Sequence, residues 1–243
     1  LRPAGYRTLM VGTWHAEELP TDRGFDRYFG LADGCANFFN PGVQREGEAA
    51  PAEKNFPRKW SNDGDVVRPF TPEDREFYAT DAFTDAALEY LDEYQDEENP
   101  YFLYVAYTAP HYPLHAPEED IAKYRGRYRM GWDALRRERH ARMIDLGIVD
   151  ARWPLTPRDE RVPAWEDIGE RAKWRLEELG EGKPRGLRWE DARDADAWDL
   201  KMAVYAAMID RMDQNIGRIL DKIREQGEED NTLVMFLSDN GGC

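Results

Sequence analysis

The sequence has few cysteines, no long apolar run and no excess of basic residues, and each shortage excludes a class of protein. Cys35 and Cys243 are too few for a disulfide framework or a thiolate metal cluster. No apolar stretch approaches the roughly 20 residues that cross a bilayer, and the first residues lack the basic and apolar regions of a signal peptide. The net charge is -16. We therefore expect neither a membrane span nor a nucleic-acid partner.

The chain nevertheless has enough apolar residues for a folded core. Its 243 residues are 41% hydrophobic and 12% aromatic, which suits one large domain or most of one. Both ends look cut, because the first residues lead directly into an apolar run and the last ones stop inside a polar loop at 238–243. Domain boundaries normally fall in polar linkers. We therefore expect the chain to be part of a longer protein.

Apolar runs and helical periodicity alternate along the chain. The excursion from about Gly30 to Pro72 has no sustained period and is expected to be irregular, with at most short strands. Elsewhere the patterns predict buried strands at 8–12, 101–107 and 232–237, and helices at 80–94 and 197–225. This order predicts an α/β fold with a mostly parallel central sheet flanked by helices.

A charged region from about Pro117 to Trp198 interrupts this alternation. Helical pieces are expected at 132–146 and 168–179, and several prolines lie between them. High charge and repeated proline suit a surface better than a core layer. The region is therefore predicted to be a helical insertion over one end of the sheet, with no central strand.

Polar residues follow each of the three predicted strands. His15 follows the first, His111 the second, and Asp239 with Asn240 the third. Because ligands bind outside the carboxyl ends of parallel strands, we expect these side chains to meet. A carboxylate beside an amide oxygen suits a hard cation such as Ca²⁺ or Mg²⁺. Two imidazoles could hold an anionic substrate or protonate a leaving oxygen.

Structural explanations compete with this functional one. Asp-Asn-Gly-Gly is also an ordinary turn sequence, and His111 could be a packed loop residue. His115 lies four residues after His111, but Pro113 prevents the helix that would pair them on a metal, so His115 is interpreted as substrate-proximal. His140 lies among arginines on a predicted helix, where a solvated face is the simpler interpretation.

Several stretches, in this order, resemble the sulfatase family of the alkaline phosphatase-like superfamily, and specifically bacterial arylsulfatases. They are Gly5-Tyr6-Arg7-Thr8 to Gly12-Thr13-Trp14-His15, Arg23-Gly24-Phe25-Asp26, Thr80 to Asp85, Ala109 to Pro117, Asp213 to Gly217, and Asp230 to Gly241. The resemblance implies a sulfuric ester hydrolase that uses a calcium ion and a formylglycine nucleophile.

The family's nucleophile motif, Cys-x-Pro-Ser-Arg, is absent from the chain. Cys35 is followed by Ala36 and Asn37, and nothing follows Cys243. The paired N-terminal aspartates that bind calcium and a later lysine are absent too. The resemblance therefore implies that residues 1–243 are part of a sulfatase catalytic domain, that the formylglycine lies upstream of Leu1, and that this chain is inactive alone.

The family's site residues can be carried over by position. Asp239 and Asn240 match the calcium ligands, and His15 matches the histidine that engages the formylglycine hydroxyl. His111 matches the histidine that contacts the sulfate near the leaving oxygen. Thr13 stands where the family has a lysine that bonds the sulfate. Charge-assisted hydrogen bonds are roughly twice as strong as neutral ones, so Thr13 predicts weakened turnover.

Other functions fit the same sequence. The scaffold could hydrolyse a phosphoester or phosphonate ester, or it could bind a sulfate ester with impaired catalysis. An unrelated α/β domain would have Asp-Asn-Gly-Gly only as a turn. The expected ligand is a small-molecule or glycan sulfate ester. The sequence leaves its identity, the oligomeric state and the compartment open, although a periplasmic or secreted location fits a full-length protein of this family.

Overall fold

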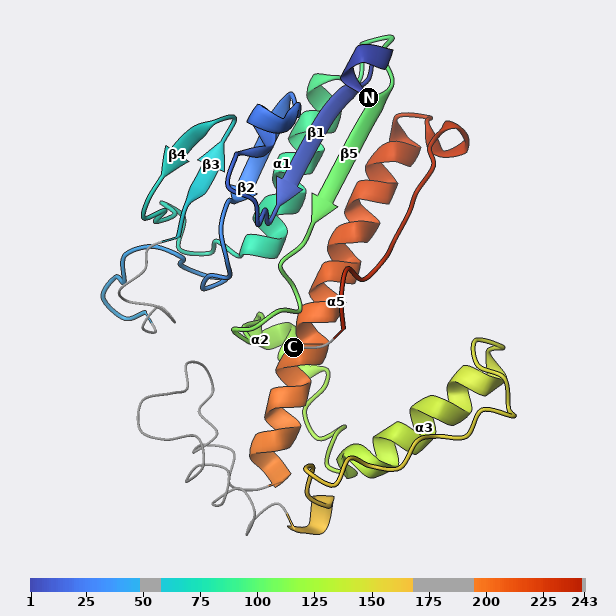
Figure 1. Cartoon of the computed structure of the whole chain (residues 1–243). Helices are drawn as coiled ribbons and strands as arrows, with labels where there is room; N and C mark the ends of the chain where they lie inside the picture. Colours follow the sequence, from blue (N-terminus) through green and yellow to red (C-terminus); the bar gives the residue numbers. More distant parts are fainter. Residues whose placement is uncertain (49–57, 168–194, 242–243) are drawn as a thin grey trace. The chain divides into compact units, whose positions relative to one another are not determined.

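The computed structural model describes residues 1–48, 58–167 and 195–241. The chain divides into two compact units, which are described separately. One unit comprises Leu1–Ala116 and Met208–Cys243, and the other comprises Pro117–Ala207. Figure 1 shows the elements of both along the chain.

A five-stranded sheet, in the order β4-β3-β2-β1-β5, is the centre of the first unit. The strands are β1 (Arg7–Gly12), β2 (Arg27–Leu31), β3 (Trp60–Asn62), β4 (Asp65–Val67) and β5 (Tyr101–Ala106). Strand β1 is parallel to both β2 and β5, whereas β3 pairs antiparallel with both β2 and β4. The expected α/β sheet with a parallel centre is confirmed, and β1 and β5 lie where the apolar runs predicted them. Strand β2 was not predicted.

The burial of β1 and β5 differs with their positions in the sheet. Leu9, Met10 and Val11 of β1 are fully buried, as expected for a central strand covered on both faces. Strand β5 was expected to be covered in the same way, but this was wrong. Its residues are only partly buried, and the side chain of Tyr104 is 44% exposed. The reason is its position, because β5 is the last strand of the described sheet.

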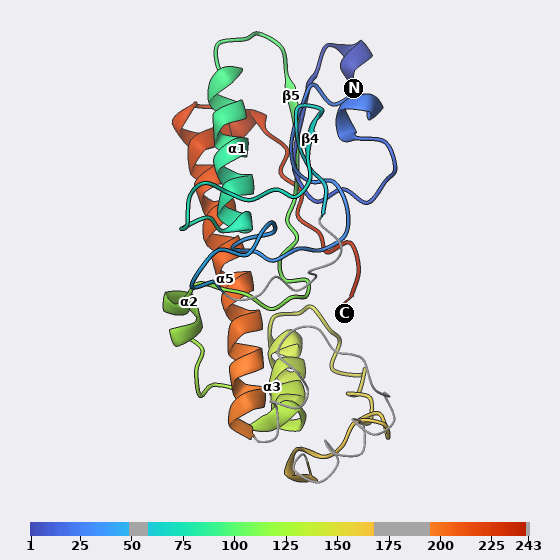
Figure 2. The same ribbon diagram turned by 90° about the vertical axis from the view of Figure 1, so that its left-hand side faces the viewer.

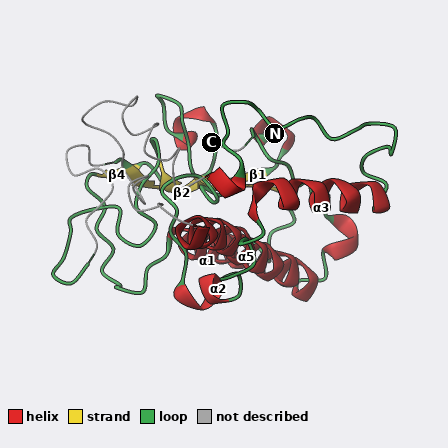
Figure 3. Cartoon of the chain, turned by 90° about the horizontal axis from the view of Figure 1, so that it is seen from below, coloured by secondary structure: helices red, strands yellow, loops and turns green. Residues whose placement is uncertain are grey.

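Helices α1 (Ala79–Glu93) and α5 (Ala195–Glu225) confirm the two main helical predictions, and Tyr78 is the N-cap residue of α1. Within the first unit, α1 and the later part of α5 lie side by side on one face of the sheet (Figures 2 and 3). Asp81 accepts hydrogen bonds from Arg211 Nη2 (2.6 Å) and Asn215 Nδ2 (2.7 Å). Two of the family-like stretches, 80–85 and 213–217, therefore meet in this helix contact.

The segment between β1 and β2 covers the opposite face of the sheet (Figure 2). It contains the short helix η2 (Pro20–Arg23). Its partly buried side chains pack on a small core of Met10, Tyr28 and Ala32. The chain direction after β1 is therefore fixed by apolar contacts close to the strand's carboxyl end.

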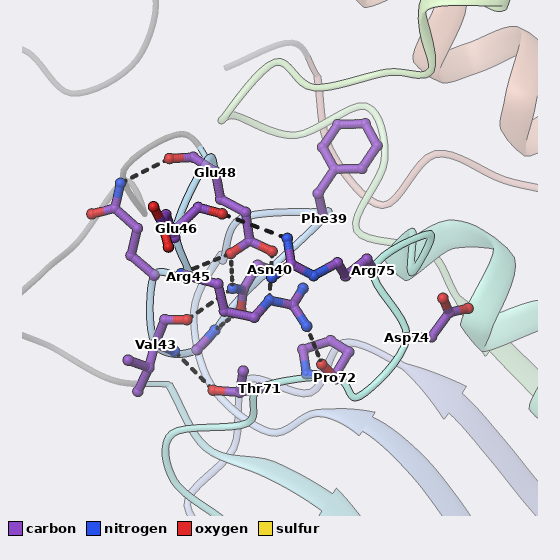
Figure 4. A network of polar contacts seen from close by, with 12 residues as sticks. Phe39, Asn40, Val43, Arg45, Glu46, Glu48, Thr71, Pro72, Asp74 and Arg75 are labelled. Atoms are coloured by element: carbon purple, nitrogen blue, oxygen red, sulfur yellow. Dashed lines mark hydrogen bonds and ion pairs between the residues drawn. The ribbon is translucent and has the colours of Figure 1, made fainter.

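The long excursion after β2 is held by a polar network (Figure 4). The buried Asn40 side chain donates to Glu48 Oε2 (2.6 Å), and Arg45 donates to Glu48 Oε1 (2.5 Å) and to the Pro72 carbonyl (2.7 Å). Desolvation raises the pKa of Glu48, but hydrogen bonds from Arg45 and Asn40 outweigh it and hold that pKa below its ordinary value. The described part of the excursion is therefore irregular but ordered by side chains.

The strand predicted at 232–237 is not formed. After α5 and the turn η5 (Glu229–Asn231), these residues are extended without ladder hydrogen bonds. The apolar side chains from Leu233 to Leu237 are each between 55% and 83% exposed. A β-strand requires a hydrogen-bonded neighbour, and no described strand pairs with this segment. The apolar pattern alone therefore could not produce the predicted strand.

The second unit is helical in the part that the structure describes. It contains α2 (Glu118–Ala122), α3 (Gly131–Asp145), the turn η3 (Trp165–Asp167) and the first part of α5. Helix α3 confirms the helix predicted at 132–146, whereas the one predicted at 168–179 lies outside the described residues. No strand falls in the described part of 117–198. Across the described ranges of the chain, no helix is long and apolar enough to span a membrane.

Candidate active site

The exits of β1 and β5 lie together at the carboxyl end of the sheet. The two strands are parallel neighbours with Gly12 opposite Ala106, and the Thr13 amide donates to the Ala106 carbonyl (2.8 Å). The loops that carry His15 and His111 therefore leave the sheet at the same end, as predicted. The third expected contributor, the loop with Asp239 and Asn240, follows no strand in the structure.

Two glycines allow the strands to approach closely at this end. Gly12 has a φ of +106°, and a Cβ atom there would lie 2.0 Å from the Ala106 carbonyl oxygen. A Cβ atom on Gly30 of β2 would lie 1.9 Å from the Gly12 carbonyl oxygen. Both contacts are with backbone, which cannot move aside without separating the strands. The position of Thr13 therefore depends on two consecutive close backbone contacts.

Two buried hydroxyl groups lie just beyond the strand ends. Thr13 follows β1 directly, and Thr108 lies two residues after β5. Both Oγ1 atoms are buried and have no hydrogen-bond partner among the described residues. Most buried side-chain polar atoms in proteins do have a partner, so each exception calls for an explanation. Sequence reasoning missed Thr108, although its place just after a strand was a usable signal.

His15 and His111 are both exposed, and each uses one ring nitrogen locally. His15 Nε2 lies 3.1 Å from the Gly34 carbonyl oxygen, and His111 Nδ1 lies 2.6 Å from the Tyr112 carbonyl oxygen. Because a carbonyl oxygen only accepts, these nitrogens are the donors. His15 Nδ1 and His111 Nε2 are then left to face solvent or a substrate. The His111 amide also donates to the Thr108 carbonyl (2.9 Å), which folds the loop back toward β5.

His115, the third histidine considered, packs in an aromatic cluster. Its ring centroid lies 6.3 Å from that of Phe38 and 6.1 Å from that of Phe39, and its carbonyl accepts from the Tyr78 hydroxyl (2.9 Å). Its Nδ1 atom accepts a long hydrogen bond from the Phe38 amide (3.4 Å). Burial lowers the pKa of His115, because the charged imidazolium loses hydration. These contacts explain His115 as a packing residue, and its substrate contact stays a prediction.

We expect His115→Phe to change how stability depends on pH. A folded-state pKa below the ordinary value means that the unfolded chain binds more protons, so stability rises with pH across that interval. The wild type should therefore lose stability as pH falls below about 6.5. Phenylalanine keeps an aromatic ring and removes the titration. As the pH falls from 8 to 5, the Tm of the variant should therefore rise relative to the Tm of the wild type.

The control for this experiment is Tyr78→Phe, which removes the hydroxyl that bonds the His115 carbonyl. Tyrosine does not titrate between pH 5 and 8 in its ordinary range. The control should therefore shift Tm equally at every pH. A His115→Phe profile that runs parallel to the wild type would show that this side chain is not desolvated.

Asp239 and Asn240 lie in an exposed turn in which Ser238 Oγ donates to the Asn240 carbonyl (2.6 Å). Carboxylate and amide oxygens are hard donors, and they suit Ca²⁺ or Mg²⁺ in kind. They fall short of the six or more ligands that calcium takes. The described residues contain no group of three or more His, Cys, Asp or Glu side chains that could hold a metal. The two residues can therefore supply only part of a coordination shell.

The geometry defines an α/β protein whose parallel strands end in loops with imidazole and hydroxyl groups. Comparison with known proteins gives its class, because residues 1–242 match the sulfatase family. The chain is 34% identical over 248 residues to an uncharacterized sulfatase of Schizosaccharomyces pombe, with 99% of this chain and 40% of that protein covered. It is 33% identical over 245 residues to an arylsulfatase of Klebsiella aerogenes, with 99% and 46% covered. The chain belongs to the sulfatase family.

Further relatives agree with this assignment. An N-acetylglucosamine-6-O-sulfatase of Bacteroides thetaiotaomicron is 25% identical over 277 residues, which cover 99% of this chain and 43% of that protein. The crystal structure of Ps i-CgsB is similar with a TM-score of 0.57 at 24% identity, over 99% of this chain and 38% of that one. The fold is thus the alkaline phosphatase-like α/β fold. The chain spans less than half the length of these relatives.

Proposed function

We propose that this chain supplies part of the active site of a sulfuric ester hydrolase of the arylsulfatase type. The observation that carries the proposal is the common exit of β1 and β5, which brings the loops with His15 and His111 to one end of the sheet. The buried hydroxyls of Thr13 and Thr108, which have no partner in the described part of the chain, lie at this same end. A sulfate group offers oxygen acceptors for such donors.

In this proposal His111 acts as the general acid through Nε2, because its Nδ1 atom is already engaged with the Tyr112 carbonyl. It would give a proton to the alcohol oxygen as the sulfur–oxygen bond breaks. His15, held through Nε2 at Gly34, would use Nδ1 to orient the attacking hydroxyl. His115 and Thr13 would contact the substrate.

The proposed site needs two further components, a covalent nucleophile and a metal ion. A formylglycine hydrate, expected from sequence upstream of Leu1, would supply the covalent nucleophile. Asp239 and Asn240 would supply some of the oxygen ligands of a calcium ion. The positive charge of the ion would reduce the repulsion between anionic oxygens in the site. Magnesium fits the same donors. We therefore expect no hydrolysis by residues 1–243 alone.

The proposed substrate is a sulfated sugar or a small aryl sulfate. One relative is named for N-acetylglucosamine 6-O-sulfate chemistry and another as an arylsulfatase. Ps i-CgsB was crystallised with k-i-k-neocarrahexaose, an oligosaccharide. Exposure of His15 and His111 is compatible with a ligand that extends from the carboxyl end of the sheet into solvent.

A second candidate is a sulfate-ester-binding homologue with impaired catalysis, and Thr13 favours it. A neutral hydroxyl at the position of the family's lysine forms weaker bonds to an anion than an ammonium group. Hydrolysis of a phosphoester or phosphonate ester on the same scaffold is the other alternative.

The test is an assay of the longer protein, with its upstream sequence, on matched aryl sulfate and aryl phosphate esters. We expect hydrolysis of the sulfate in preference to the phosphate, loss of that activity with His111→Ala, and inhibition by a calcium chelator. Binding of the aryl sulfate without turnover, measured by calorimetry, would favour the impaired homologue. Preference for the phosphate, or full activity of His111→Ala, would overturn the proposal.

A further inference from the structure

The second unit carries a concentration of positive charge in an otherwise acidic chain. Between residues 121 and 144 there are eight lysines and arginines but only two acidic residues, whereas the whole chain has a net charge of -16. Four of the arginines lie within seven residues of α3, at 136, 137, 139 and 142. Only Gly131 of this helix is buried. The helix therefore presents its charged side chains to solvent rather than to a core.

One face of α3 is covered by the chain that returns from its end, which runs alongside the helix (Figure 1). Trp132 Nε1 donates to the Pro163 carbonyl (3.1 Å), Arg136 Nη2 donates to the Thr156 carbonyl (2.9 Å), and His140 Nε2 donates to the Trp153 carbonyl (2.9 Å). Residues 132, 136 and 140 are four apart and share one side of the helix. The return segment therefore occupies that side and leaves the flanks open.

Three arginines on the open flanks have no structural role in the described residues. Arg137, Arg139 and Arg142 are exposed, and none of their side chains has a hydrogen bond or ion pair with a described residue. We call these three side chains the α3 arginine cluster. Arg139 and Arg142 are three residues apart, so they point to the same flank, whereas Arg137 points to the other flank of the covered side.

Several other exposed arginines of this unit are neutralised by acidic neighbours, and the exposed Arg127 guanidinium lies 5.2 Å from the ring centroid of Tyr124. Arg125 pairs with Glu118 (2.8 Å) and Arg161 with Asp159 (2.6 Å). In the same way Arg152 pairs with Asp150 (3.1 Å). The α3 arginine cluster therefore differs from its surroundings in having charge available for an external anion.

An exposed aromatic ring lies in the segment that covers α3. The side chain of Trp153 is 58% exposed, and its backbone carbonyl is held by His140, the residue next to Arg139. A large apolar ring on a surface provides a flat area on which the carbon–hydrogen face of a sugar can stack. A planar guanidinium group can donate two parallel hydrogen bonds to two oxygens of a tetrahedral sulfate group. Together these groups offer the two chemistries that a sulfated sugar chain presents.

We propose that the α3 arginine cluster, which lies on both flanks of the return segment, and Trp153 on that segment form a binding surface for a sulfated polysaccharide. The ligand class rests on the proposed function, because a hydrolase of sulfate esters meets such chains as substrates. The net charge of -16 opposes every polyanion, so binding depends on this local cluster and not on a broad positive field. The exposed ring beside the arginines favours a sulfated glycan, and nucleic acid is the alternative ligand in the test.

The test measures binding of the protein to fluorescent dextran sulfate, with uncharged dextran and a DNA duplex as comparison ligands. The triple variant Arg137→Ser, Arg139→Ser and Arg142→Ser should weaken dextran sulfate binding by roughly fivefold or more, because three exposed charge contacts are lost. Trp153→Ala should weaken it by a smaller factor. Added salt should weaken the binding of dextran sulfate to the wild type, and it should reduce the difference in affinity between the wild type and the triple variant.

The matched control is the triple variant Arg125→Ser, Arg152→Ser and Arg161→Ser. It removes the same net charge from the same unit, but each of these arginines already has an acidic partner. Its affinity should stay close to that of the wild type. Equal losses in both triple variants would mean that only net charge matters and would overturn the proposal. So would equally tight binding of DNA.

This readout is independent of catalysis. Dextran sulfate binding that depends on the α3 arginine cluster supports the proposal even if the longer protein fails to hydrolyse sulfate esters. Conversely, a hydrolase whose dextran sulfate affinity is unchanged by the triple variant retains its proposed function and loses this binding surface.

Discussion

Thr13→Lys should raise the turnover of an aryl sulfate by about tenfold or more in the longer protein that carries its upstream nucleophile. An ammonium at this position would form charge-assisted hydrogen bonds to the transferring sulfate group, where the native hydroxyl has no described partner. Tenfold corresponds to roughly 1.4 kcal/mol of additional transition-state stabilisation. The backbone there is fixed by the amide bond to the Ala106 carbonyl, so the new side chain should start from the same place. Steady-state kinetics with saturating calcium would measure the gain.

Thr13→Met is the matched control for this gain. It extends the side chain to a similar length without charge, so it should leave turnover unchanged or lower it. In the Thr13→Lys background, Asp239→Asn should remove the gain by weakening the hard-cation shell. If Thr13→Lys fails to raise the rate and Asp239→Asn has no effect, neither residue belongs to a sulfatase-like centre and both assignments must be abandoned.

The central strands and helices could be predicted because each carries a local pattern of its own. The run from Thr8 to Gly12 is apolar and continuous, and its burial in β1 follows from that composition. Helix α5 was predicted from its long apolar stripe, and it includes the buried residues Met208 and Ile219. For such elements the periodicity of side chains is sufficient.

Strand β2 and the segment 232–237 show where local pattern fails. Strand β2 (Arg27–Leu31) is short, begins with a charged residue and contains Gly30, so it lacks the continuous apolar run that predicted β1. It becomes a strand because Gly30 allows close contact with Gly12 of β1. Residues 232–237 have the opposite property, since their composition favours a strand but no described neighbour pairs with them. Strand formation depends on a partner, which one segment's composition does not reveal.

The candidate site, like the fold, was only partly predictable from the sequence. The histidines at 15 and 111 could be placed at one end of the sheet because each follows an apolar strand. The place of Thr108 just after a strand was a usable signal, but the burial of its hydroxyl without a described partner depends on contacts between distant segments. The aromatic packing of His115 depends on such contacts too, and only the fold reveals them.

Gly12→Ala should be the most destabilising of the single substitutions considered. The added methyl carbon would lie 2.0 Å from the Ala106 carbonyl oxygen, and Gly12 has a φ of +106°, which L side chains rarely adopt. Backbone strain and overpacking each cost about 1–3 kcal/mol, and their sum approaches the stability of many whole domains. We expect Tm to fall by about 10 °C or more, at roughly 2–4 °C per kcal/mol for a chain of this size. Thermal unfolding followed by circular dichroism measures the change.

Gly217→Ala provides the matched control, because it makes the same chemical change at a glycine with no neighbouring atom within 4 Å. Gly217 lies in α5, where alanine is the better helix former by about 1 kcal/mol. Its Tm should therefore stay level or rise slightly. Gly30→Ala should resemble Gly12→Ala, since its methyl carbon would meet the Gly12 carbonyl oxygen at 1.9 Å. If both Gly12→Ala and Gly30→Ala unfold within about 2 °C of the wild type, which corresponds to no more than about 1 kcal/mol, β1, β2 and β5 are not packed as closely as the structure shows.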